Sequence, residues 1–242
     1  MVKSARYTRP DRLSKTGLNE MEAMQLLIEK KREALRTGLL SMADQVATGL
    51  HRSLEALRNQ DSALCQAIIA DDTVINQGRR ALEQQTLVVL ASHQPAGRDL
   101  RLIGATLEII SELERIADHA ADVARILLRA PASPLPIEPA KRIGIMGDIA
   151  LAMFTQVMAV YAENGSADRA RAAVARESEV DALEETSIRD VITWLCDQRE
   201  SSCLLGMQLL WIAHHYERVA DRATNIAEQI IYIETGETPE LS

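Results

Sequence analysis

The sequence predicts an all-α protein made of two pseudo-symmetric, antiparallel three-helix bundles. Helix-favouring residues, chiefly Ala, Leu, Glu, Arg and Gln, are abundant, and aromatic residues make up only 3% of the 242 residues. No stretch alternates polar and apolar residues for long enough to build a sheet. The segment 113–125 recurs as 216–228 with six identities in thirteen positions, which indicates an internal duplication.

The chain divides at its one Pro-rich segment, residues 131–137, which we expect to link two halves. The first three-helix bundle is predicted over residues 17–130 and the second over residues 138–242. Residues 1–16 are basic and polar without apolar periodicity, so we expect a flexible N-terminal tail there.

Turn and cap residues set the limits of the expected helices. Asp61-Ser62 supplies a turn and an N-cap, Pro95 suits a first helical turn, and Gly236 suits a helix C-terminus. A second break is expected at residues 163–166. The predicted helices, all with apolar residues at helical spacing, cover residues 18–59, 64–92, 95–129, 138–162, 167–197 and 202–233.

Each copy of the repeat carries a glutamate and an aspartate four residues apart, so that both carboxylates lie on one side of a helix. The preceding helix in each half carries another such pair. Facing residues in an antiparallel hairpin have numbers that add to a constant, and turns near residues 95 and 199 bring the two pairs together. We therefore predict two oxygen-rich sites, one from Asp72, Asn76, Glu114, Asp118 and Asp122, the other from Glu177, Asp181, Glu217, Asp221 and Asn225.

The acidic pairs border apolar surface that faces a neighbouring helix. Glu114 and Asp118 share a side of their helix with Ile110. Acidic groups crowded at such a seam repel one another unless a cation joins them. A separate stripe of the same helix is expected in solvent, formed by Glu108, Glu112, Arg115 and His119.

Two kinds of cation could join these carboxylates. One is a salt-bridge network with nearby arginines, of which Arg101, Arg115, Arg125 and Arg218 are the candidates. The other is a metal ion with oxygen ligands, whose identity carboxylates alone do not decide. The Glu-x-x-His signature of di-iron bundles is absent. His214, three residues before Glu217, is either a further ligand or an ordinary core-edge histidine.

Composition excludes several classes of protein. The net charge of −8 argues against general nucleic-acid binding. The apolar run at 204–213 is too short to cross a bilayer, and the N-terminus lacks a signal peptide, so we expect a cytoplasmic protein without direct membrane insertion. Three cysteines without a Cys-x-x-Cys motif indicate neither a disulfide framework nor a zinc finger. The sequence shows neither a nucleophile–base pair nor a Gly-rich phosphate-binding loop, so we do not expect an enzyme.

From about residue 20 to residue 237 the chain resembles the PhoU family of bacterial phosphate regulators. The motifs that carry the resemblance are residues 71–76, 94–101, 113–118, 216–228 and 232–237. The resemblance implies two three-helix bundles, with acidic motifs that hold iron or zinc in some members. Manganese and magnesium stay as alternatives, because carboxylates also bind them. It also implies a negative regulator of phosphate-starvation signalling, acting between the phosphate ABC transporter and a sensor histidine kinase.

Several residues make the two halves unequal. Asn76 stands where an acid is common, and Asn225 corresponds to Asp122, so both sites need not bind metal. Asp99 and Arg101 have no counterpart in the second half, and they either contact a partner or only pair at a helix start. A metal-dependent hydrolase, a purely structural acidic seam, and a monomer or a homodimer all stay open.

Overall fold

The computed structural model describes residues 15–93, 95–130, 133–196 and 203–241. Every regular element in these ranges is an α-helix, so the all-α prediction is confirmed. The helices are α1 (Lys15–Asn59), α2 (Ser62–His93), α3 (Arg98–Arg129), α4 (Ile137–Ala162), α5 (Ala167–Ala173), α6 (Glu177–Cys196) and α7 (Cys203–Thr235).

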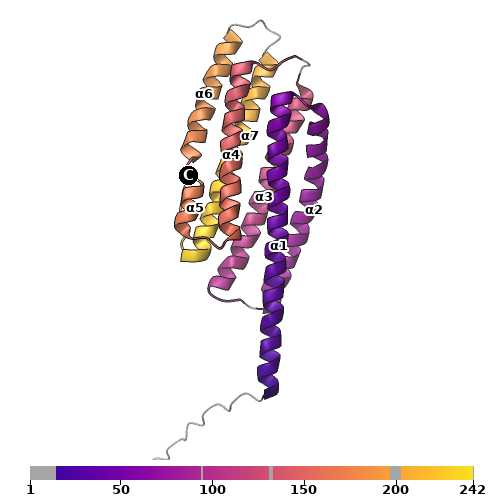
Figure 1. The fold of residues 1–242 in the computed structure, drawn as a ribbon, viewed down its shortest axis with the longest axis vertical. Helices are drawn as coiled ribbons and strands as arrows, with labels where there is room; N and C mark the ends of the chain where they lie inside the picture. The colour runs from indigo at the N-terminus through magenta and orange to yellow at the C-terminus, as the bar shows by residue number, and fades with distance from the viewer. Residues whose placement is uncertain (1–14, 94, 131–132, 197–202, 242) are drawn as a thin grey trace, which may run out of the picture.

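The helices form two antiparallel bundles that lie side by side (Figure 1). Helices α1, α2 and α3 form the first, and α4, α7 and the α5–α6 pair form the second. Helix α3 packs against α7, and α1 packs against α4, so the bundles meet along two seams. Residues 1–14 of the predicted tail and residues 131–132 of the Pro-rich segment lie outside the described residues, and α1 already begins at Lys15, inside the predicted tail. The other proposed domain limits stay predictions.

The expected turn residues act where the sequence places them. Oδ1 of Asp61 accepts hydrogen bonds from the backbone N–H groups of Ala63 and Leu64, at 2.9 and 3.0 Å, and caps α2. The hydroxyl of Ser166 caps α5. Gly236 has a φ of 81°, and its N–H donates to the carbonyl of Tyr232, which ends α7.

Two predicted helix limits were wrong. Helix α3 begins at Arg98, because Gly97 has a φ of 59° that a right-handed helix does not allow. The single helix expected over 167–197 is two helices, α5 and α6, separated by a turn at 174–176. That turn uses backbone hydrogen bonds between residues three apart and contains neither Gly nor Pro, so residue types alone do not predict it.

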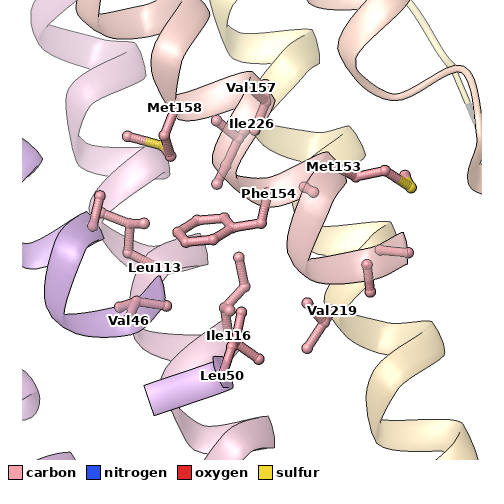
Figure 2. Packing of buried hydrophobic residues seen from close by; sticks show 14 of the residues in the cluster. Val46, Leu50, Leu113, Ile116, Met153, Phe154, Val157, Met158, Val219 and Ile226 are labelled. Carbon is pink, nitrogen blue, oxygen red and sulfur yellow. The ribbon is translucent and has the colours of Figure 1, made fainter. Parts of the chain in front are cut away.

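One hydrophobic core extends through both bundles and includes residues of all seven helices. Its centre is Phe154 of α4, the single phenylalanine of the chain. In Figure 2 its ring points from α4 toward Leu113 and Ile116 of α3, near Val46 of α1. Because the apolar faces of α3 and α7 are buried in the same core, the polar residues beside them are held in fixed positions.

Helix α4 is the one helix among the described residues that is long and apolar enough to cross a membrane. Its most apolar window has a mean hydropathy of 1.7, but 61% of that window is buried inside the protein. A core helix meets the same criteria, so this is weak evidence for a membrane span.

Gly147 of α4 allows a close approach between the bundles, and we predict that Gly147→Ala destabilises the protein. A Cβ there would lie 2.5 Å from Leu54 and 3.1 Å from the ring of Tyr216, both fully buried. Overpacking costs about 1–3 kcal/mol, which outweighs a helix-propensity gain of up to about 1 kcal/mol. Gly49→Ala in α1, where a Cβ meets nothing within 4 Å, should instead be stabilising. Equal free energies of unfolding in urea for the two variants would contradict this.

Candidate functional site

The first acidic site lies between α2 and α3 and comprises Asp72, Asn76, Glu114, Asp118 and Asp122. Asp72 and Asp118 are close enough for Asp72 to raise the pKa of Asp118, which agrees with the residue counting across the hairpin. Nδ2 of Asn76 donates to Oδ1 of Asp72 at 3.4 Å. The structure thus brings these side chains together, and their role as metal ligands stays a prediction.

Crowding changes the protonation of this site. Burial raises the pKa of Asp118 from its usual 3.8 to about 6, and the carboxylates of Glu114, Asp72 and Asp122 add to the shift. No ion pair joins Asp118 to a basic residue within the described ranges. Asp118 therefore takes up a proton more readily than an ordinary aspartate, and a bound cation would favour its ionised form.

Arginines neutralise part of the first acidic site. Arg125 lies 3.0 Å from Asp72 and 2.7 Å from Asp122. Nε of Arg79 lies 3.4 Å from Glu114. Arg125 was among the arginines considered from the sequence and Arg79 was not, although it follows Asp72 by seven residues, two turns along the same face of α2.

The second acidic site lies between α6 and α7 and comprises Glu177, Asp181, Glu217 and Asp221. Burial, then the neighbouring Asp181 and Asp221, raises the pKa of Glu177. Burial and Asp221 also raise the pKa of Asp181. For Glu217 burial is again the largest cause, followed by Asp221, and its pKa reaches about 7 although Arg218 opposes the shift. These four carboxyl groups are therefore electrostatic neighbours.

Arg218 supplies the positive charge of the second acidic site, at 2.5 Å from Asp221 and 3.5 Å from Glu217. It does not satisfy Glu217 fully, because Oε2 of Glu217 is buried and accepts no hydrogen bond. Nδ1 of His214 lies 3.4 Å from that oxygen and 3.5 Å from Glu184.

Glu184, His214 and Glu217 place three metal-type ligand atoms within 4.8 Å of one another, as no other group among the described residues does. Glu184 was not among the residues predicted from the sequence. It lies three residues after Asp181 and seven after Glu177, so helical spacing could have identified it. His214, which the sequence left undecided, points its Nδ1 into this group.

Asn225 does not join the second acidic site. Its Nδ2 donates to Oε2 of Glu112 at 3.3 Å, across the seam between α7 and α3. The expectation that Glu112 and His119 face solvent was therefore wrong. Glu112 is 7% exposed and also lies 3.5 Å from Arg222. A helical wheel of α3 alone cannot show that a second bundle covers this stripe.

A histidine pair lies in the same seam between α3 and α7. Nδ1 of His119 on α3 lies 3.1 Å from Nδ1 of His215 on α7, and the Trp211 ring is 6.5 Å from the His215 ring. Burial, then His215 and Arg222, lowers the pKa of His119 to about 4. Burial also lowers the pKa of His215. Both rings are neutral at pH 7.

Asp99 and Arg101 make contacts at the start of α3. Asp99 lies 3.0 Å from Arg32 of α1. Arg101 donates to the carbonyl of Ile233 near the end of α7, at 3.3 and 3.4 Å. These contacts fit the structural alternative considered from the sequence, and a partner role for either residue stays a prediction.

A family model described as the PhoU domain matches the chain twice, at residues 39–127 and 143–230. These segments fall in the first and second bundles. The match therefore supports the duplication deduced from the repeated acidic segment.

Curated relatives and solved structures agree with this assignment. The phosphate-specific transport system accessory protein PhoU homolog of Rhizobium meliloti (strain 1021) is 33% identical over 188 residues, 78% of each chain. The homolog of Pseudomonas aeruginosa is 32% identical over 208 residues, 84% of each chain.

The crystal structure of PhoU from Pseudomonas aeruginosa matches with a TM-score of 0.82 at 28% identity, over 86% of this chain and 99% of that one. The phosphate transport system regulatory protein PhoU of Streptococcus pneumoniae matches with a TM-score of 0.81 at 28% identity, over 88% and 99%. With two matched repeats, relatives above 30% identity over most of the chain and the same fold, this protein belongs to the PhoU family.

Proposed function

We propose that this protein is an accessory regulator of a phosphate-specific transport system, which represses phosphate uptake and the phosphate-starvation response when phosphate is plentiful. The observation that carries this proposal is the PhoU match over both bundles, because the relatives are named as accessory or regulatory proteins of phosphate transport. Those names describe no enzyme, and we propose no catalytic activity for this chain.

The proposed mode of action is that of an adaptor in the cytoplasm. One partner is the phosphate ABC transporter and the other a sensor histidine kinase, which would bring the protein to the inner face of the membrane through protein contacts. Asp99 and Arg101, near the meeting point of α1, α3 and α7, are candidate contact residues. Self-association into a homodimer is compatible with this role.

We further propose that the acidic sites bind iron or zinc, with manganese or magnesium as alternatives. The second acidic site fits a metal well, since a buried oxygen of Glu217 accepts no hydrogen bond and Glu184 and His214 lie beside it. Glu177, Asp181 and Asp221 could supply further oxygen ligands. In the first acidic site Arg79 and Arg125 already neutralise part of the charge, so weaker binding is expected there. A metal bound in the second acidic site would hold α6 against α7, and a metal bound in the first would hold α2 against α3.

Deleting the gene from its source bacterium should raise alkaline phosphatase activity in phosphate-rich medium, and the intact gene should reverse the rise. The double variant Glu217→Gln, Asp221→Asn should restore repression less well than Glu108→Gln, an exposed control on α3. Unchanged alkaline phosphatase after deletion would contradict the regulator proposal. Full repression by the double variant would separate regulation from the acidic site.

Metal analysis of protein purified without chelators should find bound iron or zinc. Glu184→Gln with Glu217→Gln should remove most of the metal, because the substitutions take two ligands from one cation. Glu185→Gln, an exposed neighbour that pairs with Arg189, should retain it. Metal-free protein whose melting temperature does not change with added iron, zinc or manganese would refute the metal proposal.

Chelator-treated protein should lose thermal stability as the pH rises from about 4.5 to 7.5. The folded pKa values of Asp118 and Glu217, about 6 and about 7, lie above the usual 3.8 and 4.5, so the folded state binds more protons than the unfolded state in this window. Glu217→Gln should reduce the slope, since it remains neutral. A melting temperature that rises across this window would show that the arginines fully compensate both sites.

A further inference from the structure

The seam between α3 and α7 is built from pseudo-equivalent residues. The repeat offset of 103 residues, which relates Glu114 to Glu217, also relates Glu112 to His215 and His119 to Arg222. In the structure, the first position of each repeat contacts the second position of the other repeat. Glu112 lies 3.5 Å from Arg222, and His215 lies 3.1 Å from His119. The same two positions thus form an ion pair at one end of the seam and a histidine pair at the other.

A third pair of equivalent residues completes both ends. Asn225 donates to Glu112 at the ion-pair end. Its equivalent, Asp122, lies one turn after His119 on α3, and its carboxylate acts electrostatically on both histidine rings. One end therefore holds a carboxylate, an amide and a guanidinium cation. The other holds two imidazoles and the carboxylate of Asp122, which is paired with Arg125 from outside the repeat-related set.

The spacing of the two imidazole nitrogens suits a metal ion. Zinc and similar metals bind histidine nitrogen at about 2.0–2.1 Å, so nitrogens 3.1 Å apart can share one metal at an angle of about 100°. Without a metal, one of these nitrogens must donate a proton to the other. A shared metal would replace that proton and satisfy both lone pairs.

We propose that His119, His215 and Asp122 form a binding site for a divalent first-row transition metal in the seam between the bundles. Two histidines and one carboxylate are a recurrent donor set for such metals, with water completing the coordination. The two histidine nitrogens are already in place, whereas Asp122 lies 2.7 Å from Arg125 and would have to leave this ion pair to become the third ligand. The site differs from the two acidic sites because its ligands are mainly nitrogen and come from both bundles.

This assignment gives the metal a mechanical role. The histidines lie on α3 and α7, so a metal bound to both would clamp the two bundles together, as the Glu112–Arg222 pair does at the other end of the seam. The inference does not depend on phosphate regulation.

Trp211 provides a probe inside the chain, since its ring lies 6.5 Å from that of His215. In a Trp194→Phe background it is the single tryptophan. Co²⁺ added to the full-length, chelator-treated protein should quench its fluorescence saturably. His119→Ala and His215→Ala should each weaken the apparent Co²⁺ affinity at least about tenfold. Removing a residue that only hydrogen-bonds to a metal ligand already lowers metal affinity by about that factor, and these variants remove a ligand itself.

The double variant Glu184→Gln, Glu217→Gln is the matched control, because it removes the neighbouring ligand group but leaves the histidine pair intact. It should retain the quenching. Quenching lost in this control and kept in both histidine variants would overturn the proposal, as would no quenching at millimolar Co²⁺.

A measurement on the unsubstituted chain guards against variants that fail to fold. Zn²⁺ should shift the ring nitrogen resonances of His119 and His215 in NMR spectra, and it should raise the melting temperature. Ring resonances of both histidines that do not respond to Zn²⁺ would likewise overturn the assignment.

Discussion

The burial of α3 and α7 in one shared hydrophobic core is the constraint on which the other features depend. Apolar faces of both helices pack around Phe154, and this fixes the rotation of each helix about its axis. The acidic residues that flank these faces then have no freedom to separate. Raised pKa values at Asp118 and Glu217 are the electrostatic consequence of that packing. A core shared by both bundles also explains why Glu112 and His119 of the first half contact Asn225 and His215 of the second.

Much of this arrangement could be predicted from the sequence, because helix periodicity and residue counting are local rules. The pairing of Asp72 with Asp118 followed from spacing alone. The positions of Glu112 and Asn225 could not be predicted in this way, since they depend on how one bundle lies on the other. The break between α5 and α6 was missed for a different reason: ordinary residues adopt a turn there, without Gly or Pro.

The duplicated halves have diverged most in how they neutralise charge. In the first acidic site two arginines from α2 and α3 reach the carboxylates. In the second, one arginine shares the site with His214 and leaves an oxygen of Glu217 without a hydrogen bond. The same contrast appears along the α3–α7 seam, where Arg222 is replaced by His119 in the equivalent place. Cation binding is therefore expected to be unequal between the halves.

The most direct test of the account is anomalous X-ray scattering from crystals grown with iron or zinc, measured at the absorption edge of the metal. We expect a peak in the second acidic site, within coordination distance of Glu184, His214 and Glu217, and a weaker peak or none in the first. A second acidic site without a peak, in which Arg218 and water molecules contact every carboxylate, would show that the acidic seam is structural and contradict the account.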